Sequence, residues 1–183
     1  MKVPTIKDGS LGTPDSPGWA TVPTESVALG PVPLSAQPTA YIRETWASRP
    51  YGTTASASVA AASDGQKLYV RLEWADDAKP NTEFQDAAGA VFATAADSTI
   101  ATLGSSAAPV GVWYWENGRK EALSLASKGP GVVRKDAADA VNAAAAAADG
   151  KWSVVLIGPL AAAKAGKLPM SDDAYMTSAF RPG

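Results

Sequence analysis

Few residues in this chain could hold a metal or act on a substrate, because it contains neither histidine nor cysteine. The lack of cysteine excludes disulfides, thiolate zinc sites, iron–sulfur clusters and a cysteine nucleophile. The lack of histidine excludes the Ser-His-Asp triad, the HExxH zinc motif and the usual haem or copper ligand. Met170 and Met176 then remain as soft ligands for a metal or a haem iron. A methionine ligand favours reduced iron, which suits electron transfer, whereas a single methionine more often fills a gap in a core.

Two adjacent carboxylate pairs, Asp76-Asp77 and Asp172-Asp173, are the candidates for acid–base or calcium chemistry. Neighbouring residues on a strand point to opposite faces, so neither pair converges on one atom. The chain also has no D-x-D-x-D-G calcium loop, no P-loop and no G-x-G-x-x-G motif. We interpret both pairs as solvated turns and expect no free-standing enzyme.

The tryptophans offer a second kind of chemistry. Trp113 and Trp115 alternate with Tyr114, so both indoles lie on one face of an expected strand. With Trp74 and Trp152 they could form a stacking platform for sugar rings, as in carbohydrate-binding modules. Tryptophans at alternating strand positions more often fill the core between two sheets, and we favour that interpretation.

The charge balance, 18 acidic against 16 basic side chains, limits the partners. Because the net charge is −2 and the basic residues are scattered, neither a nucleic acid nor a polybasic membrane anchor is expected. No apolar run reaches the roughly 18–20 residues that a membrane helix needs. The N-terminus has no apolar stretch behind a basic start, so we expect no signal peptide and a soluble or membrane-peripheral protein. Periplasm and cytoplasm both stay open.

Hydrophobic alternation predicts the strands. Apolar and polar side chains alternate over Lys67–Trp74, the clearest half-buried strand, and the turn Asp64-Gly65 joins it to Ser56–Ala62 as a β-hairpin. The same design recurs around Asp149-Gly150, so we interpret the alanine tract before that turn as a strand, although alanine favours helices. Further strands are predicted over 87–94, 110–115, 121–126 and 175–180, and one helical turn over 161–166.

Many short strands with regular turn signals predict a mainly β fold, an antiparallel β-sandwich with a few short helices. A length of 183 residues suits a single domain. We expect residues 56–183 to form the sandwich core. Residues 1–55 are rich in Pro, Thr, Ser and Gly, and Pro31, Pro33 and Pro38 predict an extended arm with edge segments there.

Five segments in series resemble a known family. They read DSPGW (Asp15–Trp19), ASVAAASDGQKLYVRLEWADD (Ala57–Asp77), FQDAAGAVF (Phe84–Phe92), PVGVWYWENG (Pro109–Gly118) and DGKWSVVLIGPL (Asp149–Leu160). In this order they resemble the γ subunits of the type II branch of the dimethyl sulfoxide reductase family, such as those of ethylbenzene dehydrogenase, dimethylsulfide dehydrogenase, and selenate and chlorate reductases. The fold of that family is also a β-sandwich with short helices.

The resemblance implies an accessory role in an oxidoreductase complex. In the family, the γ subunit binds one b-type haem between its sheets and relays electrons between an iron–sulfur subunit and an external carrier. Substrate chemistry takes place at molybdenum in another subunit. The implied partners are therefore a catalytic molybdenum subunit and an iron–sulfur subunit. We expect the arm 1–55 to wrap a partner, since a stable interface buries about 1,000 Å² or more.

The two iron ligands of the family, a Met and a Lys, are not matched at their family positions. Leu103 stands at the position of the Met, and an aliphatic side chain cannot bind iron. The segment that carries the family Lys reads AYMTSAFRPG here, without a lysine. The substitute ligand candidates are Met176 or Met170, with Lys164 or Lys167.

Three alternatives follow from the resemblance and the tryptophans. An electron-relaying haem b subunit and a haem-free structural or assembly subunit are about equally favoured, and a carbohydrate-binding sandwich module is third. The candidates for lining a haem pocket or an aromatic platform are Trp74, Leu103, Trp113 and Trp115.

Overall fold

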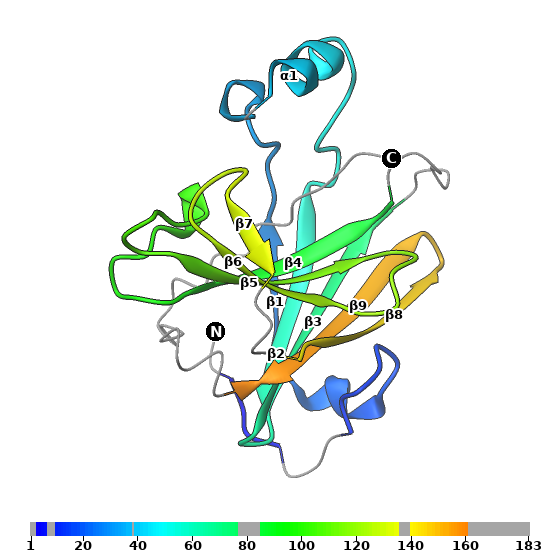
Figure 1. The fold of residues 1–183 in the computed structure, drawn as a ribbon. Coiled ribbons are helices and arrows are strands. Elements are labelled where there is room, and N and C mark those ends of the chain that lie inside the picture. The colour runs from blue at the N-terminus through cyan, green and yellow to red at the C-terminus, as the bar shows by residue number, and fades with distance from the viewer. Residues whose placement is uncertain (1–2, 7–9, 38, 77–84, 136–139, 161–183) are drawn as a thin grey trace.

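The alternating segments form two antiparallel sheets that pack face to face (Figure 1). This computed structural model describes residues 3–6, 10–37, 39–76, 85–135 and 140–160. The five-stranded sheet has the order β1-β2-β3-β9-β8, and the four-stranded sheet has the order β4-β5-β6-β7. The strands are β1 (Thr24–Ala28), β2 (Ser56–Ser63), β3 (Lys67–Ala75), β4 (Ala87–Ala93), β5 (Val110–Glu116), β6 (Leu123–Ser127), β7 (Val133–Lys135), β8 (Asn142–Ala148) and β9 (Lys151–Pro159). The predicted β-sandwich is confirmed.

The helices of the described residues are short. One α-helix, α1 (Ala40–Trp46), begins after Thr39, whose side chain accepts a hydrogen bond from the Ile42 backbone N–H. The others are the 3-10 helices η1 (Pro17–Thr21), η2 (Leu34–Ala36) and η3 (Ile100–Thr102). Within the described ranges, no helix has both the length and the apolar character needed to cross a membrane. The strand and helical turn predicted over 175–180 and 161–166 lie outside the described residues.

Both predicted hairpins form, with different turns. In the β2–β3 hairpin, the Asp64 carboxylate accepts hydrogen bonds from the backbone N–H of Gln66 and Lys67, at 2.9 and 2.7 Å. In the β8–β9 hairpin, Asp149 and Gly150 have φ of +52° and +69°, as in a two-residue type I′ turn. The alanine tract is a strand, because pairing with β9 overrides its helix propensity.

The two hairpins lie side by side through the β3–β9 pairing, and their inward positions correspond. Val70 and Leu72 of β3 lie opposite Leu156 and Val154 of β9, and all four are buried in the core between the sheets. At one end of this strand pair Trp74 lies opposite Trp152, and at the other end Leu68 lies opposite Gly158. The two ends of the inter-sheet space are therefore filled differently.

The central part of the five-stranded sheet, on β2, β3 and β9, is buried on both faces. On the outer face, Leu11, Trp19 and Val22 of the N-terminal segment pack with Tyr69 and Val155 in a second core. Tyr69 is consequently only 3 % exposed, although the sequence predicted a half-buried strand. This part of the expected partner-wrapping arm covers the protein's own sheet.

Trp19 and Arg71 hold this N-terminal segment in place. The Trp19 Nε1–H donates to the Thr13 carbonyl oxygen at 3.0 Å. The Arg71 guanidinium lies 5.0 Å from the Trp19 ring centroid and pairs with Glu73 at 3.2 Å. A Cβ on Gly18 would lie 2.8 Å from Leu11 Cδ2, which explains the glycine before Trp19.

Replacing Arg71 by methionine keeps the apolar stem but removes the charge over Trp19. We expect it to lower the free energy of unfolding by about 1 kcal/mol, because a partly desolvated cation–π contact is lost. Urea unfolding followed by tryptophan fluorescence measures this. The matched control is Lys151→Met, which breaks a more exposed ion pair with Glu73 and should cost about 0.5 kcal/mol or less. Equal costs for the two variants would contradict the role given to Arg71.

The rest of the arm forms a projecting loop, defined as residues 29–55. Its ends are joined where the Leu29 backbone N–H donates to the Ala55 oxygen at 2.8 Å. The loop contains α1, which has no buried residue and extends away from the sandwich (Figure 1). Tyr41 and Val32 are 75 % and 48 % exposed. The described surface of this loop is therefore largely accessible.

Candidate functional site

Three indoles meet at one end of the inter-sheet space and form what we call the tryptophan cluster: Trp74, Trp115 and Trp152. Trp74 and Trp152 are directly paired on β3 and β9 and stack with ring centroids 6.3 Å apart. Trp115 reaches them from β5, with centroids 5.1 Å from Trp152 and 6.5 Å from Trp74. The cluster therefore joins the two sheets.

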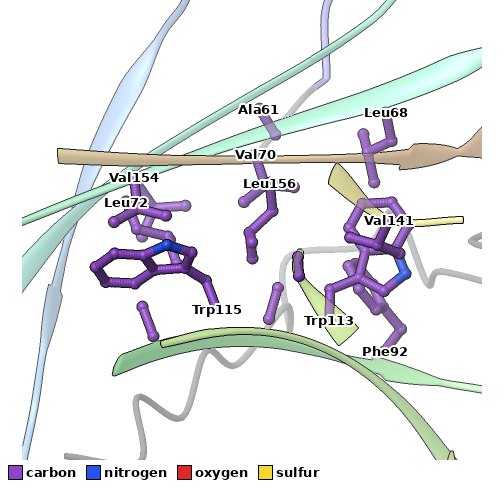
Figure 2. Packing of buried hydrophobic residues seen from close by; sticks show 14 of the residues in the cluster. Ala61, Leu68, Val70, Leu72, Phe92, Trp113, Trp115, Val141, Val154 and Leu156 are labelled. Atoms are coloured by element: carbon purple, nitrogen blue, oxygen red, sulfur yellow. The ribbon is translucent and has the colours of Figure 1, made fainter. Parts of the chain in front are cut away.

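Trp113 fills the other end of the same space. Figure 2 shows its ring among Leu68, Val141 and Phe92, and the Phe92 centroid lies 4.7 Å away in an edge-on arrangement. Trp74, Trp113 and Trp115 are only 4 %, 3 % and 6 % exposed. Their rings contact the core and not solvent, which agrees with the core interpretation and gives no support to a sugar platform.

An acidic pair adjoins the tryptophan cluster. The Trp152 Nε1–H donates to Asp76 Oδ2 at 3.1 Å, and Asp86 interacts with both Asp76 and Trp152. Partial burial, reinforced by the charge of Asp76, raises the pKa of the Asp86 carboxyl above its ordinary value. Asp76 is thus more than part of a solvated turn, whereas Asp77 lies outside the described residues. Sequence reasoning missed Asp86, since no spacing motif links it to Asp76.

Asp86→Asn should change how stability depends on pH. Because the folded pKa is raised, the folded state binds this proton more tightly than the unfolded state does. The contribution of Asp86 is therefore greatest at low pH and is lost as pH rises from about 3.8 through the folded pKa. We expect the free energy of unfolding of Asp86→Asn to rise relative to that of the parent between pH 3.5 and pH 7. Urea unfolding across that range measures this difference.

Asp64→Asn provides a control of opposite sign. The backbone hydrogen bond from Lys67 is the main cause that lowers the pKa of Asp64. The stability that its carboxylate contributes is present at neutral pH and is lost as pH falls through the folded pKa. The free energy of unfolding of Asp64→Asn should therefore fall relative to that of the parent as pH rises. The same trend for Asp64→Asn and Asp86→Asn would contradict the opposite pKa shifts given to the two carboxyls.

The substitute iron-ligand candidates Met170, Met176, Lys164 and Lys167 all lie outside the described residues. Leu103 is described: it follows η3 in the left-handed conformation, with φ of +53°. Gly104 comes next with φ of +84°, and a Cβ there would lie 2.8 Å from the Ser127 oxygen. The half-buried Leu103 therefore sits on a tightly packed loop before β5, where no atom of its side chain can bind iron.

The described residues offer lysine, tyrosine and carboxylate groups but no soft ligand for a haem iron. They contain no methionine, histidine or cysteine. No cluster of three or more carboxylates in these ranges is placed to hold a metal ion. The described inter-sheet space is occupied by indole and aliphatic side chains (Figure 2). We therefore derive no electron-transfer step from these residues.

Comparisons with known proteins add the remaining observation. No protein-family model matches the chain. Over 151 residues, 78 % of this chain and 50 % of the relative, it is 33 % identical to a Haloferax mediterranei protein provisionally named as a respiratory nitrate reductase haem subunit. Over 176 residues, 87 % of this chain and 64 % of the relative, it is 31 % identical to the dimethylsulfide dehydrogenase subunit gamma of Rhodovulum sulfidophilum. The chain spans half to just under two thirds of the length of these relatives, and the resemblance seen in the sequence is confirmed.

Proposed function

We propose that this chain, a homologue of γ-type haem subunits of oxidoreductases, is the non-catalytic γ-type subunit of a molybdenum oxidoreductase complex of the dimethyl sulfoxide reductase family. The observation that supports it is similarity over 151 and 176 residues, lengths that include strands of both sheets. The lack of histidine and cysteine agrees with an accessory role. The expected partners are a catalytic molybdenum subunit and an iron–sulfur subunit.

The proposal has two versions that differ in haem content. The haem-relay version is favoured by the name of the Haloferax relative, a haem subunit. It requires iron ligands from outside the described residues, where Met170, Met176, Lys164 and Lys167 are the candidates. The haem-free version is favoured by Leu103 at the family methionine position. In that version the sandwich contributes buried interface area to assembly.

A visible spectrum of the purified complex separates the two versions. The affinity-tagged chain is isolated from its native cells, and bound proteins are identified by mass spectrometry. A molybdenum subunit and an iron–sulfur subunit should be recovered with it. A Soret band that stays with this chain supports the haem relay, and its absence from fully loaded complex supports haem-free assembly. Recovery of the chain without any oxidoreductase subunit would contradict both versions.

The ligand candidates have their own test when a Soret band is present. Met170→Leu and Met176→Leu each remove a thioether while keeping a similar apolar volume. The variant that removes an iron ligand should shift the reduced haem spectrum, whereas the other should not. Unchanged spectra for both variants would exclude methionine ligation from this segment.

A further inference from the structure

The four sheet edges of the described residues are not equally protected. An edge strand presents unpaired N–H and C=O groups, and proteins protect such edges with charge, proline, short length or burial. β7 is three residues long and carries Arg134 and Lys135. β4 is buried along its whole length. β1 follows Pro23 and carries Glu25.

Among the described residues, nothing protects β8 in any of these ways. It consists of Asn142 followed by six alanines, without charge or proline, and its last four residues are exposed. β9 pairs with one side of β8, and no described residue pairs with the other (Figure 1). Methyl side chains add little bulk beside the outer backbone of this strand. Within the part of the chain that the structure describes, the outer edge of β8 is therefore open over seven residues.

The type I′ turn determines which backbone N–H and C=O groups of β8 bond to β9 and which point away from it. In a two-residue hairpin the flanking residues, here Ala148 and Lys151, exchange both hydrogen bonds, and bonded residues then alternate along the strand. Ala146 and Ala144 thus bond to β9. The N–H and C=O groups of Ala147, Ala145 and Ala143 point outward, spaced to pair with another strand.

The side chains beside this edge indicate what an added strand would contact. Ala143, Ala145 and Ala147 lie opposite Leu156, Val154 and Trp152, so they face the inter-sheet space. Ala143 and Trp152 are only partly buried there. An incoming strand would cover them with its alternate side chains, which favours apolar residues at every second position.

We propose that the outer edge of β8 binds an extended segment of a partner subunit, which becomes the sixth strand of this sheet. The proposal rests on the proposed function, which supplies the partner. Two copies of this chain are a poorer fit, because two paired alanine strands bury far less than the roughly 1,000 Å² of a stable interface. Paired alanine tracts would also specify no register. A partner subunit can add area elsewhere on this chain.

Ala145→Pro tests the free donors. The substitution removes an outward N–H and places the proline ring on the edge, while the β8–β9 hydrogen bonds are kept. We expect an unchanged thermal midpoint and a roughly tenfold or greater loss of affinity for the partner subunit. Ala145→Thr keeps the N–H and should bind like the parent. Ala146→Pro removes a bond to β9 and should lower the thermal midpoint.

Amide hydrogen exchange gives a second readout that does not depend on a variant. The N–H groups of Ala143, Ala145 and Ala147 should exchange at least about tenfold more slowly in the assembled complex than in the free chain. Those of Ala144 and Ala146 should change little. Unprotected edge amides in the complex, or self-pairing of two copies through β8, would overturn the proposal. A parent chain that enters no complex would overturn the proposed function itself, and the partner strand with it.

Discussion

Gly158→Ala should destabilise the fold by about 3 kcal/mol, at the upper end for overpacking in a core. The added Cβ would lie 2.4, 2.7 and 2.9 Å from the Cζ2, Cη2 and Cε2 atoms of Trp113. Real Cβ atoms do not approach other atoms this closely, so the indole or the strand must shift. The indole has little room, because Phe92 lies against it with ring centroids 4.7 Å apart. The glycine thus accommodates a tryptophan of the opposite sheet.

Urea unfolding of Gly158→Ala and two comparison variants tests this contact. Gly111→Ala is the matched control, since its Cβ would have its nearest neighbours at 4.0 Å and should change stability by about 0.5 kcal/mol or less. In a Trp113→Leu background the clash is absent, so the alanine at 158 should cost much less than in the parent. An equal cost in both backgrounds would contradict the assigned contact.

Trp115→Ala should cost about 3–5 kcal/mol, the range for removing a buried aromatic side chain. Trp115 is 6 % exposed and contacts two other indoles, so its loss leaves a cavity between the sheets. The alanine cannot reach Trp74 or Trp152. The surrounding strands are held by their own ladders, which limits how far the cavity collapses.

The free energy of unfolding by urea, monitored by circular dichroism, measures this loss. Trp115→Phe is the matched control. Its loss in free energy of unfolding should be less than half of the loss in Trp115→Ala, because the phenyl ring keeps most contacts with Trp152. If Trp115→Ala were as stable as the parent, the cluster would not join the sheets as described. Circular dichroism is preferred, since each substitution removes a fluorophore.

The sequence predicted the central strands because apolar and polar residues alternate clearly there and Asp-Gly turns mark the hairpins. The alternation over Lys67–Trp74 and the Asp-Gly turns placed β2, β3, β8 and β9 correctly. The strands predicted over 87–94, 110–115 and 121–126 are β4, β5 and β6, within two residues at each end. β1 and β7 were missed, since Thr24–Ala28 is mostly polar and Val133–Lys135 is only three residues long.

The outer core and the acidic pair could not be predicted from spacing. Leu11, Trp19 and Val22 lie in irregular backbone and 3-10 helix, where no period of 2 or 3.6 marks a buried face. Asp76 and Asp86 come together only because β3 ends, and β4 begins, beside the tryptophan cluster. That proximity is a tertiary property. The tryptophans themselves were predicted as core, because their alternation on β5 needs only local structure.

Native mass spectrometry of the tagged complex, with molybdenum measured in the same sample, tests the central proposal most directly. We expect an assembly in which one copy of this chain is bound to a molybdenum-containing subunit and an iron–sulfur subunit. The molybdenum content should match the number of copies of this chain. A chain recovered alone, or with partners that contain no molybdenum, would contradict it.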